Sequence, residues 1–149
     1  MFKSIPIWSL KIDGHKNIPQ AGQSYIIVAN HESATDILAI YQLGIQFRWL
    51  LKDSIFRLPL LNKALKWADY VPIQRGDKDS HQKALKHCQE HLKNRTPVLF
   101  FPEGTRSTTG SPKAFKTGAF HLAKQSNVPV LPIVLCGAGN LLQKKQKNH

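Results

Sequence analysis

Residues 25–36 read YIIVANHESATD, in which five apolar residues give way abruptly to a polar stretch. The run Tyr25–Ala29 has the length and the β-branched content of a buried strand. The spacing of Ser33 and Asp36 is typical of a capping box with Ser33 as the N-cap, which predicts a helix over Ile37–Leu43. The stretch therefore predicts a strand that passes through a polar loop into a helix, the unit from which α/β sheets are built.

Short apolar runs alternate with helix-like stretches through the rest of the chain. Further strands are predicted over Gln46–Leu51, Tyr70–Ile73, Pro97–Phe101 and Val130–Leu135, and further helices over Pro59–Ala68, Lys78–Lys93 and Phe115–Gln125. Pro72 restricts its strand to an edge or to a short piece, because proline lacks the N–H that a ladder needs. The alternation predicts an α/β fold, with a mixed central β-sheet flanked by helices and a strand order that the pattern leaves open.

Length and charge define the broad class of protein. The 149 residues suit a single domain over 1–149, with a lead-in over residues 1–20 and a basic tail over residues 140–149. Lys and Arg number 21 against 9 Asp and Glu, a net charge of +12 that would attract nucleic acid, anionic lipid or phosphorylated ligands. The two cysteines exclude a disulfide scaffold. No segment reaches the roughly 18 apolar residues of a membrane span, so the apolar lead-in is either a shallow membrane contact or ordinary packing.

The polar loop after the first strand carries a histidine and an aspartate five residues apart. In one continuous helix, two such side chains would point about 140° away from each other. With His31 in the loop and Asp36 in the first helical turn, the carboxylate can reach back and hold the imidazole as a general base. In the alternative, Asp36 only caps the helix and His31 is an ordinary loop residue, although a carboxylate with two oxygens could do both. Ser33 is not expected to be a nucleophile, because no G-x-S-x-G elbow surrounds it.

A second polar cluster follows the fourth predicted strand and reads PEGTRS over residues 102–107. Gly104 allows a close approach of backbone to a ligand, and Arg106 offers a fork suited to phosphate. Glu103 could orient Arg106 or accept a hydrogen bond from a ligand hydroxyl, and Thr105 adds a hydroxyl group. The alternative is a polar β-turn with a solvated Glu/Arg pair. Because ligands of α/β sheets bind at the carboxyl ends of strands, both clusters are candidates for one site.

His87 and His91 lie four residues apart on the predicted helix Lys78–Lys93, a spacing that metal sites use. No third strong ligand accompanies them in the sequence, and the helix face around them is polar. We therefore expect no metal site.

Together, the two polar clusters resemble the motifs of the glycerolipid acyltransferase family, whose best-known members act on 1-acylglycerol-3-phosphate (lysophosphatidate). The first motif is NHESATD over residues 30–36, and the second is FPEGTRS over residues 101–107, about seventy residues later. Three weaker blocks are also similar to family segments: KDSIFRLP over residues 52–59, VPIQR over residues 71–75 and VPVLPI over residues 128–133. The resemblance extends to about Gly139 and implies a glycerol-3-phosphate acyltransferase-like fold.

The resemblance implies a role for each matching residue. His31 is similar to the general base that activates the hydroxyl of the acceptor for attack on an acyl thioester, and Asp36 to the residue that orients it. Arg106 is the best match for a phosphate ligand. The residues that match the acceptor-binding block or add to its phosphate site are Glu103, Gly104, Thr105, Arg106, Lys52 and either Arg75 or Arg57. Neither an acyl-enzyme nor a cofactor or metal is implied.

The resemblance implies transfer of a fatty acyl group from acyl-CoA or acyl-acyl carrier protein, as co-substrate, to lysophosphatidate or a related lysolipid. The product would be phosphatidate, made for phospholipid biosynthesis. The basic surface predicts a peripheral protein on the cytoplasmic side of an anionic membrane. The alternatives are a basic nucleic-acid-binding domain and an inactive, lipid-binding fragment of the same family. No helix-turn-helix or RNA-binding signature is present, so a nucleic-acid partner is not expected.

Overall fold

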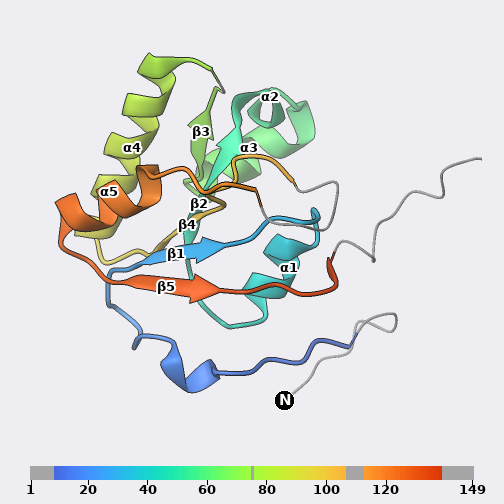
Figure 1. The fold of residues 1–149 in the computed structure, drawn as a ribbon. Helices are drawn as coiled ribbons and strands as arrows, with labels where there is room; N and C mark the ends of the chain where they lie inside the picture. The colour runs from blue at the N-terminus through green and yellow to red at the C-terminus, as the bar shows by residue number, and fades with distance from the viewer. Residues whose placement is uncertain (1–8, 75, 107–112, 139–149) are drawn as a thin grey trace, which may run out of the picture.

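The computed structural model describes residues 9–74, 76–106 and 113–138. Within these residues, one five-stranded sheet has the order β3-β2-β4-β1-β5 (Figure 1). Its strands are β1 (Ile26–Ala29), β2 (Arg48–Lys52), β3 (Val71–Ile73), β4 (Val98–Phe100) and β5 (Val130–Ile133). The helices are α1 (Asp36–Tyr41), α2 (Asp53–Phe56), α3 (Pro59–Trp67), α4 (Lys78–Lys93) and α5 (Gly118–Ser126), preceded by the 3-10 turn η1 (His15–Asn17).

The α/β fold class is confirmed, and the sheet is parallel at each of its four pairings in the described residues rather than mixed. Helical crossovers explain this, because a chain that returns through a helix enters the next strand from the same end. The proline-containing strand β3 lies at the edge of the sheet, as predicted, with Pro72 opposite Leu51. In this arrangement β1 and β4 are central neighbours, and their carboxyl ends lie at the same edge of the sheet.

The two faces of the sheet bury alternate residues of each strand. On one face, Ile26 and Val28 pack with the apolar stripes of α4 and α5. On the other, Ile27 and Ala29 pack with Ile37 and other residues of α1 and the loop that follows it. Figure 1 shows α4 and α5 together on one side of β1 and α1 on the other. The polar loop after β1 therefore starts from a strand that is buried on both faces.

Helix boundaries follow the sequence prediction where the capping signal is strong. Helix α4 covers the predicted Lys78–Lys93, and the side chain of Asp77 caps it by accepting from the N–H groups of Asp79 and Ser80. By contrast, α5 begins at Gly118 rather than at Phe115, and the one-turn helix α2 was not predicted.

None of the helices in the described residues is long and apolar enough to cross a membrane. The division of the chain into a lead-in, one domain and a basic tail stays a prediction. Residues 1–8 of the lead-in and 139–149, which contain the tail, lie outside the described residues.

Candidate active site

The two polar clusters lie side by side because β1 and β4 are adjacent and parallel. The imidazole of His31, after β1, stacks on the ring of Phe101, after β4, with centroids 4.0 Å apart and an interplanar angle of 20°. The backbone N–H of His31 donates to Oε1 of Glu103 at 2.9 Å. The structure thus brings together two segments that are separated by 72 residues.

His31 and Asp36 form a close pair at this edge of the sheet. Nδ1 of His31 is 2.7 Å from Oδ2 of Asp36, with 14% of the histidine side chain exposed and none of the aspartate. The same oxygen accepts the backbone N–H groups of Glu32 at 2.7 Å and Ser33 at 2.9 Å. A carboxylate oxygen that accepts from its neighbours assigns the proton of the imidazole to Nδ1, which leaves Nε2 as the basic nitrogen.

The predicted capping bonds at α1 are present, although the helix is assigned from Asp36. Thr35, directly before it, has helical φ and ψ of −74° and −14° and makes no side-chain capping bond. The hydroxyl of Ser33 accepts from the N–H and the hydroxyl of Thr35, at 3.3 and 3.0 Å. Asp36 in turn accepts from the N–H of Ser33, so both halves of the capping box with Ser33 as N-cap are formed. Asp36 is therefore both a capping residue and the partner of His31, and its Oδ2 atom fills both roles.

The buried side chain of Glu103 connects two loops through hydrogen bonds. Only 5% of its surface is exposed, and its second oxygen, Oε2, accepts the backbone N–H of Lys113 at 2.9 Å. The sequence suggested that Glu103 orients Arg106 or a ligand hydroxyl. In the described residues its recorded partners are instead two backbone N–H groups, from His31 and Lys113. The carboxylate thus ties the loop after β1 to the segment that leads into α5.

The turn after Glu103 gathers cations. Gly104 has a φ of 71°, and a Cβ at this position would lie 2.9 Å from Nζ of Lys116. Nζ of Lys113 donates to the hydroxyl of Thr105 and to the backbone carbonyl of Arg106, both at 3.1 Å. Arg106 is exposed, and no partner of its guanidinium is recorded within the described ranges. Two lysines and an exposed arginine around one glycine turn form a site suited to an anion.

The other predicted phosphate ligands lie farther out or outside the described residues. Lys52 is exposed at the carboxyl end of β2, the neighbour of β4 on the side away from β1. Arg57 donates to Asp53 through Nη2 at 2.7 Å and Nε at 3.1 Å, and it lines a groove of about 500 Å³ that His31 does not line. Arg75 lies outside the described residues, so its role stays a prediction.

One further residue of the first motif has a structural role that sequence reasoning missed. The side-chain amide of Asn30 donates to the carbonyl of Leu135 at 2.9 Å, and its oxygen accepts the N–H of Leu135 at 2.8 Å. These two hydrogen bonds continue the contact between β1 and β5 past the ends of both strands. The position of Asn30 directly after a buried strand was the available signal, because an amide there can replace a backbone pair.

Residues 9–136 match the sequence model of a family described as Acyltransferase. The chain belongs to the acyltransferase family. The resemblance seen in the two motifs is thus confirmed over most of the chain.

Several relatives with solved structures or curated names are similar to this chain in sequence. The crystal structure of the 1-acyl-sn-glycerophosphate (LPA) acyltransferase PlsC from Thermotoga maritima is similar with a TM-score of 0.75 and 32% identity, covering 90% of this chain and 53% of that one. The chloroplastic 1-acyl-sn-glycerol-3-phosphate acyltransferase of Arabidopsis thaliana is 39% identical over 92% of this chain and 38% of its own length. The alpha form from Mus musculus is 30% identical over 93% of this chain and 49% of its own. The chain spans about two fifths of the length of the plant relative.

Proposed function

We propose that this acyltransferase-family chain transfers a fatty acyl group from a thioester donor to the free hydroxyl of lysophosphatidate, producing phosphatidate. The observation that carries the proposal is the 2.7 Å contact between His31 and Asp36, beside a turn that holds Arg106 and two lysines. Named relatives that act on 1-acyl-sn-glycerol-3-phosphate support the choice of acceptor. The donor is proposed to be acyl-CoA or acyl-acyl carrier protein.

In the proposed reaction, His31 acts as the general base. Its Nε2 takes the proton from the acceptor hydroxyl as the oxygen attacks the thioester carbonyl, and Asp36 stabilises the imidazolium that forms. The carbon–sulfur bond then breaks, and the imidazolium returns the proton to the departing thiolate. The ester forms in one transfer, without an acyl-enzyme. Stacking on Phe101 and the hydrogen bond that Nδ1 donates to Asp36 support this role, because they hold the ring at its face and at its edge.

The phosphate of the acceptor is proposed to bind at the Gly104 turn. Arg106 is exposed, and the absence of a side chain on Gly104 leaves room for Nζ of Lys116 beside the backbone. Each charge-assisted hydrogen bond to a phosphate contributes about 1.5–3 kcal/mol. We further propose that Thr105, Lys52 and Arg75 line or extend this site.

An acyl-transfer assay tests the proposal directly. The purified chain is given lysophosphatidate, and in parallel other lysolipids, with acyl-CoA or with acyl-acyl carrier protein. We expect phosphatidate from the parent chain and loss of turnover in His31→Ala, with the far-ultraviolet circular dichroism unchanged. His81→Ala, which alters an exposed histidine on α4, is the matched control and should retain turnover. Near-parent turnover in His31→Ala would contradict the mechanism, and lipid binding without turnover in the parent would favour an inactive fragment.

We also propose that the chain acts at an anionic membrane surface. Trp67 is 92% exposed and Leu58 is 50% exposed, at opposite ends of α3, and α3 carries exposed Lys63 and Lys66. Tryptophan beside lysine suits the interface between lipid headgroups and acyl chains. Co-sedimentation with phosphatidylglycerol vesicles should weaken in Trp67→Ala and not in Val134→Ala, since Val134 is an exposed side chain next to the opposite sheet edge. Equal binding to phosphatidylcholine vesicles would contradict the role of charge.

A further inference from the structure

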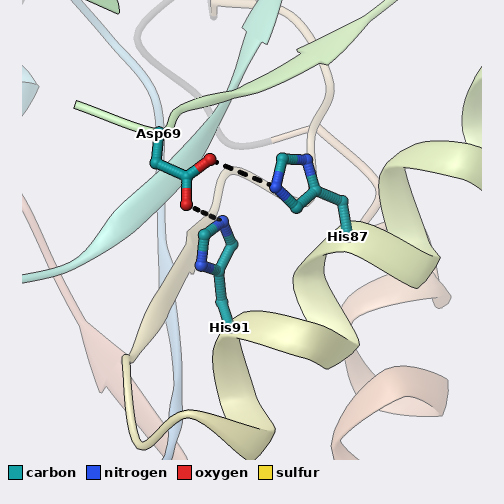
Figure 2. Close-up of side chains that lie close together, drawn as sticks. All are labelled: Asp69, His87 and His91. Carbon is teal, nitrogen blue, oxygen red and sulfur yellow. Dashed lines mark ion pairs between the residues drawn. The ribbon is translucent and has the colours of Figure 1, made fainter. Parts of the chain in front are cut away.

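A cluster of three metal-ligating side chains lies in a part of the fold that the proposed reaction does not use. Asp69 lies between α3 and β3, and His87 and His91 occupy successive turns of α4 (Figure 2). Nε2 of His87 is 3.3 Å from Oδ1 of Asp69, and Nε2 of His91 is 3.7 Å from Oδ2. One ligand atom from each residue lies within 4.8 Å of the other two. The third ligand that the sequence did not indicate is thus supplied by the fold.

We propose that Asp69, His87 and His91 form a binding site for a divalent transition-metal ion of the zinc class. Two imidazoles and one carboxylate, with a water at the fourth position, are a usual ligand set for zinc. With metal–ligand bonds of about 2.0–2.1 Å, the ligand atoms of a tetrahedron lie roughly 3.3 Å apart. The two contacts of Asp69, at 3.3 and 3.7 Å, already approach that separation.

His91 gives the strongest indication of a ligand. Its side chain is only 7% exposed, and its Nε2 is buried with no hydrogen-bond partner in the described part of the chain. The 3.7 Å contact with Asp69 is too long for a hydrogen bond, although it directs the nitrogen toward the carboxylate. A buried polar atom without a partner destabilises a fold, and a metal bond would satisfy it.

The end of α3 fixes the position of Asp69. The residue follows the C-cap Ala68 and has a left-handed φ of 56°. Its N–H donates to the carbonyl of Lys66 and the N–H of Tyr70 to that of Leu65, the Schellman pattern that closes a helix. Aspartate tolerates this conformation better than most residues. The conformation aims the carboxylate across at α4, where Figure 2 shows both imidazoles pointing toward it.

The surroundings of the cluster favour a transition metal over a hard cation. Asp69 and His87 line a groove of about 270 Å³, which leaves space for a water as the fourth ligand. Lys66 lines the same groove, and its positive charge opposes a bound cation. An ion would therefore be held by directional bonds to the three ligands rather than by general negative charge. Calcium and magnesium need several oxygen ligands, and this cluster offers a single carboxylate. A bound ion would join α4 to the connection between α3 and β3.

Titration with the metal alone tests the proposal. The full chain is stripped with a chelator, dialysed, and titrated with Zn²⁺ or Mg²⁺ in a calorimeter. We expect one Zn²⁺ site and no Mg²⁺ site, and at 100 times its Kd Zn²⁺ should raise Tm by about 5–10 °C. Co²⁺ in the same site should give the strong visible absorption of tetrahedral coordination. Absence of a stoichiometric Zn²⁺ site would show that the cluster is an ion pair only.

Variants separate this site from other metal-binding groups on the chain. His87→Gln and Asp69→Asn alter partly exposed side chains, and asparagine tolerates the left-handed backbone, so both variants should fold. Each should weaken Zn²⁺ binding at least tenfold and abolish the rise in Tm. His81→Gln, on the exposed face of the same helix, should bind Zn²⁺ like the parent. Parent-like binding in His87→Gln would overturn the proposal without bearing on the acyl-transfer site.

Discussion

Oδ2 of Asp36 lies 2.7 Å from Nδ1 of His31 and at the same time accepts two backbone N–H groups of the loop between them. Because one oxygen serves both purposes, the shape of the loop and the orientation of the imidazole depend on the same atom. A substitution at Asp36 should therefore change the proposed chemistry and the local stability together. If the imidazole rotated freely, a substitution at Asp36 would not change the chemistry and the local stability together.

Asp36→Asn tests this double role. An amide keeps the size of the side chain and can place its one oxygen where Oδ2 accepts, but it carries no negative charge to strengthen these hydrogen bonds or to stabilise the imidazolium. We expect kcat for acyl transfer to fall about 10²–10⁴-fold and the free energy of unfolding to fall by about 1–3 kcal/mol. Acyl-transfer kinetics and urea denaturation measure the two effects. Asp79→Asn, an exposed aspartate on α4, is the control, and unchanged kcat in Asp36→Asn would contradict the orienting role.

Glu103→Gln tests the hydrogen bonds by which Glu103 connects the two loops. The buried carboxylate accepts from the N–H of His31 and the N–H of Lys113, whereas a glutamine has a single oxygen and would set its NH₂ group against one of these donors. Loss of one charge-assisted bond should reduce the free energy of unfolding by about 1.5–3 kcal/mol. Urea denaturation measures this, with the exposed Glu90→Gln on α4 as the control. Equal stability of the two variants would show that the connection made by Glu103 does not stabilise the fold.

Gly104→Ala should disturb the turn in two separable ways. Its φ of 71° disfavours any side chain by about 1–2 kcal/mol, and the new Cβ would meet Nζ of Lys116. Gly22→Ala is the matched control, because Gly22 has a φ of 82° and nothing within 4 Å of the new carbon. Because Nζ is the end of an exposed, flexible side chain, we expect Lys116 to move aside and the two variants to unfold at similar temperatures. A clearly lower melting temperature of Gly104→Ala, abolished by Lys116→Ala, would instead show that Lys116 is held in place.

Parts of this fold could be predicted from the sequence because their signals are local. The helix Lys78–Lys93 has a capping aspartate and an apolar stripe, and both lie within the segment itself. The position of β3 at the sheet edge follows from Pro72 for the same reason. The pairing of His31 with Asp36 was also accessible, since a loop and one helical turn connect them.

The remaining features depend on contacts between distant segments. Glu103 binds the backbone of a residue 72 positions away, so its role depends on the adjacency of β1 and β4, which periodicity does not determine. Asp69 joins His87 and His91 because α4 packs next to β3.

The two cysteines should differ sharply in reactivity. Cys88 lies on the buried face of α4, and burial raises the pKa of its thiol to about 12, whereas Cys136 is exposed after β5. Alkylation requires the thiolate, of which Cys88 would have roughly one part in 10⁴ at pH 8. Iodoacetamide should therefore modify one thiol of the native chain and two after unfolding in urea, as measured by mass spectrometry. In Cys136→Ser the native chain should stay unmodified, and rapid labelling of Cys88 in that variant would show that α4 opens readily from the sheet.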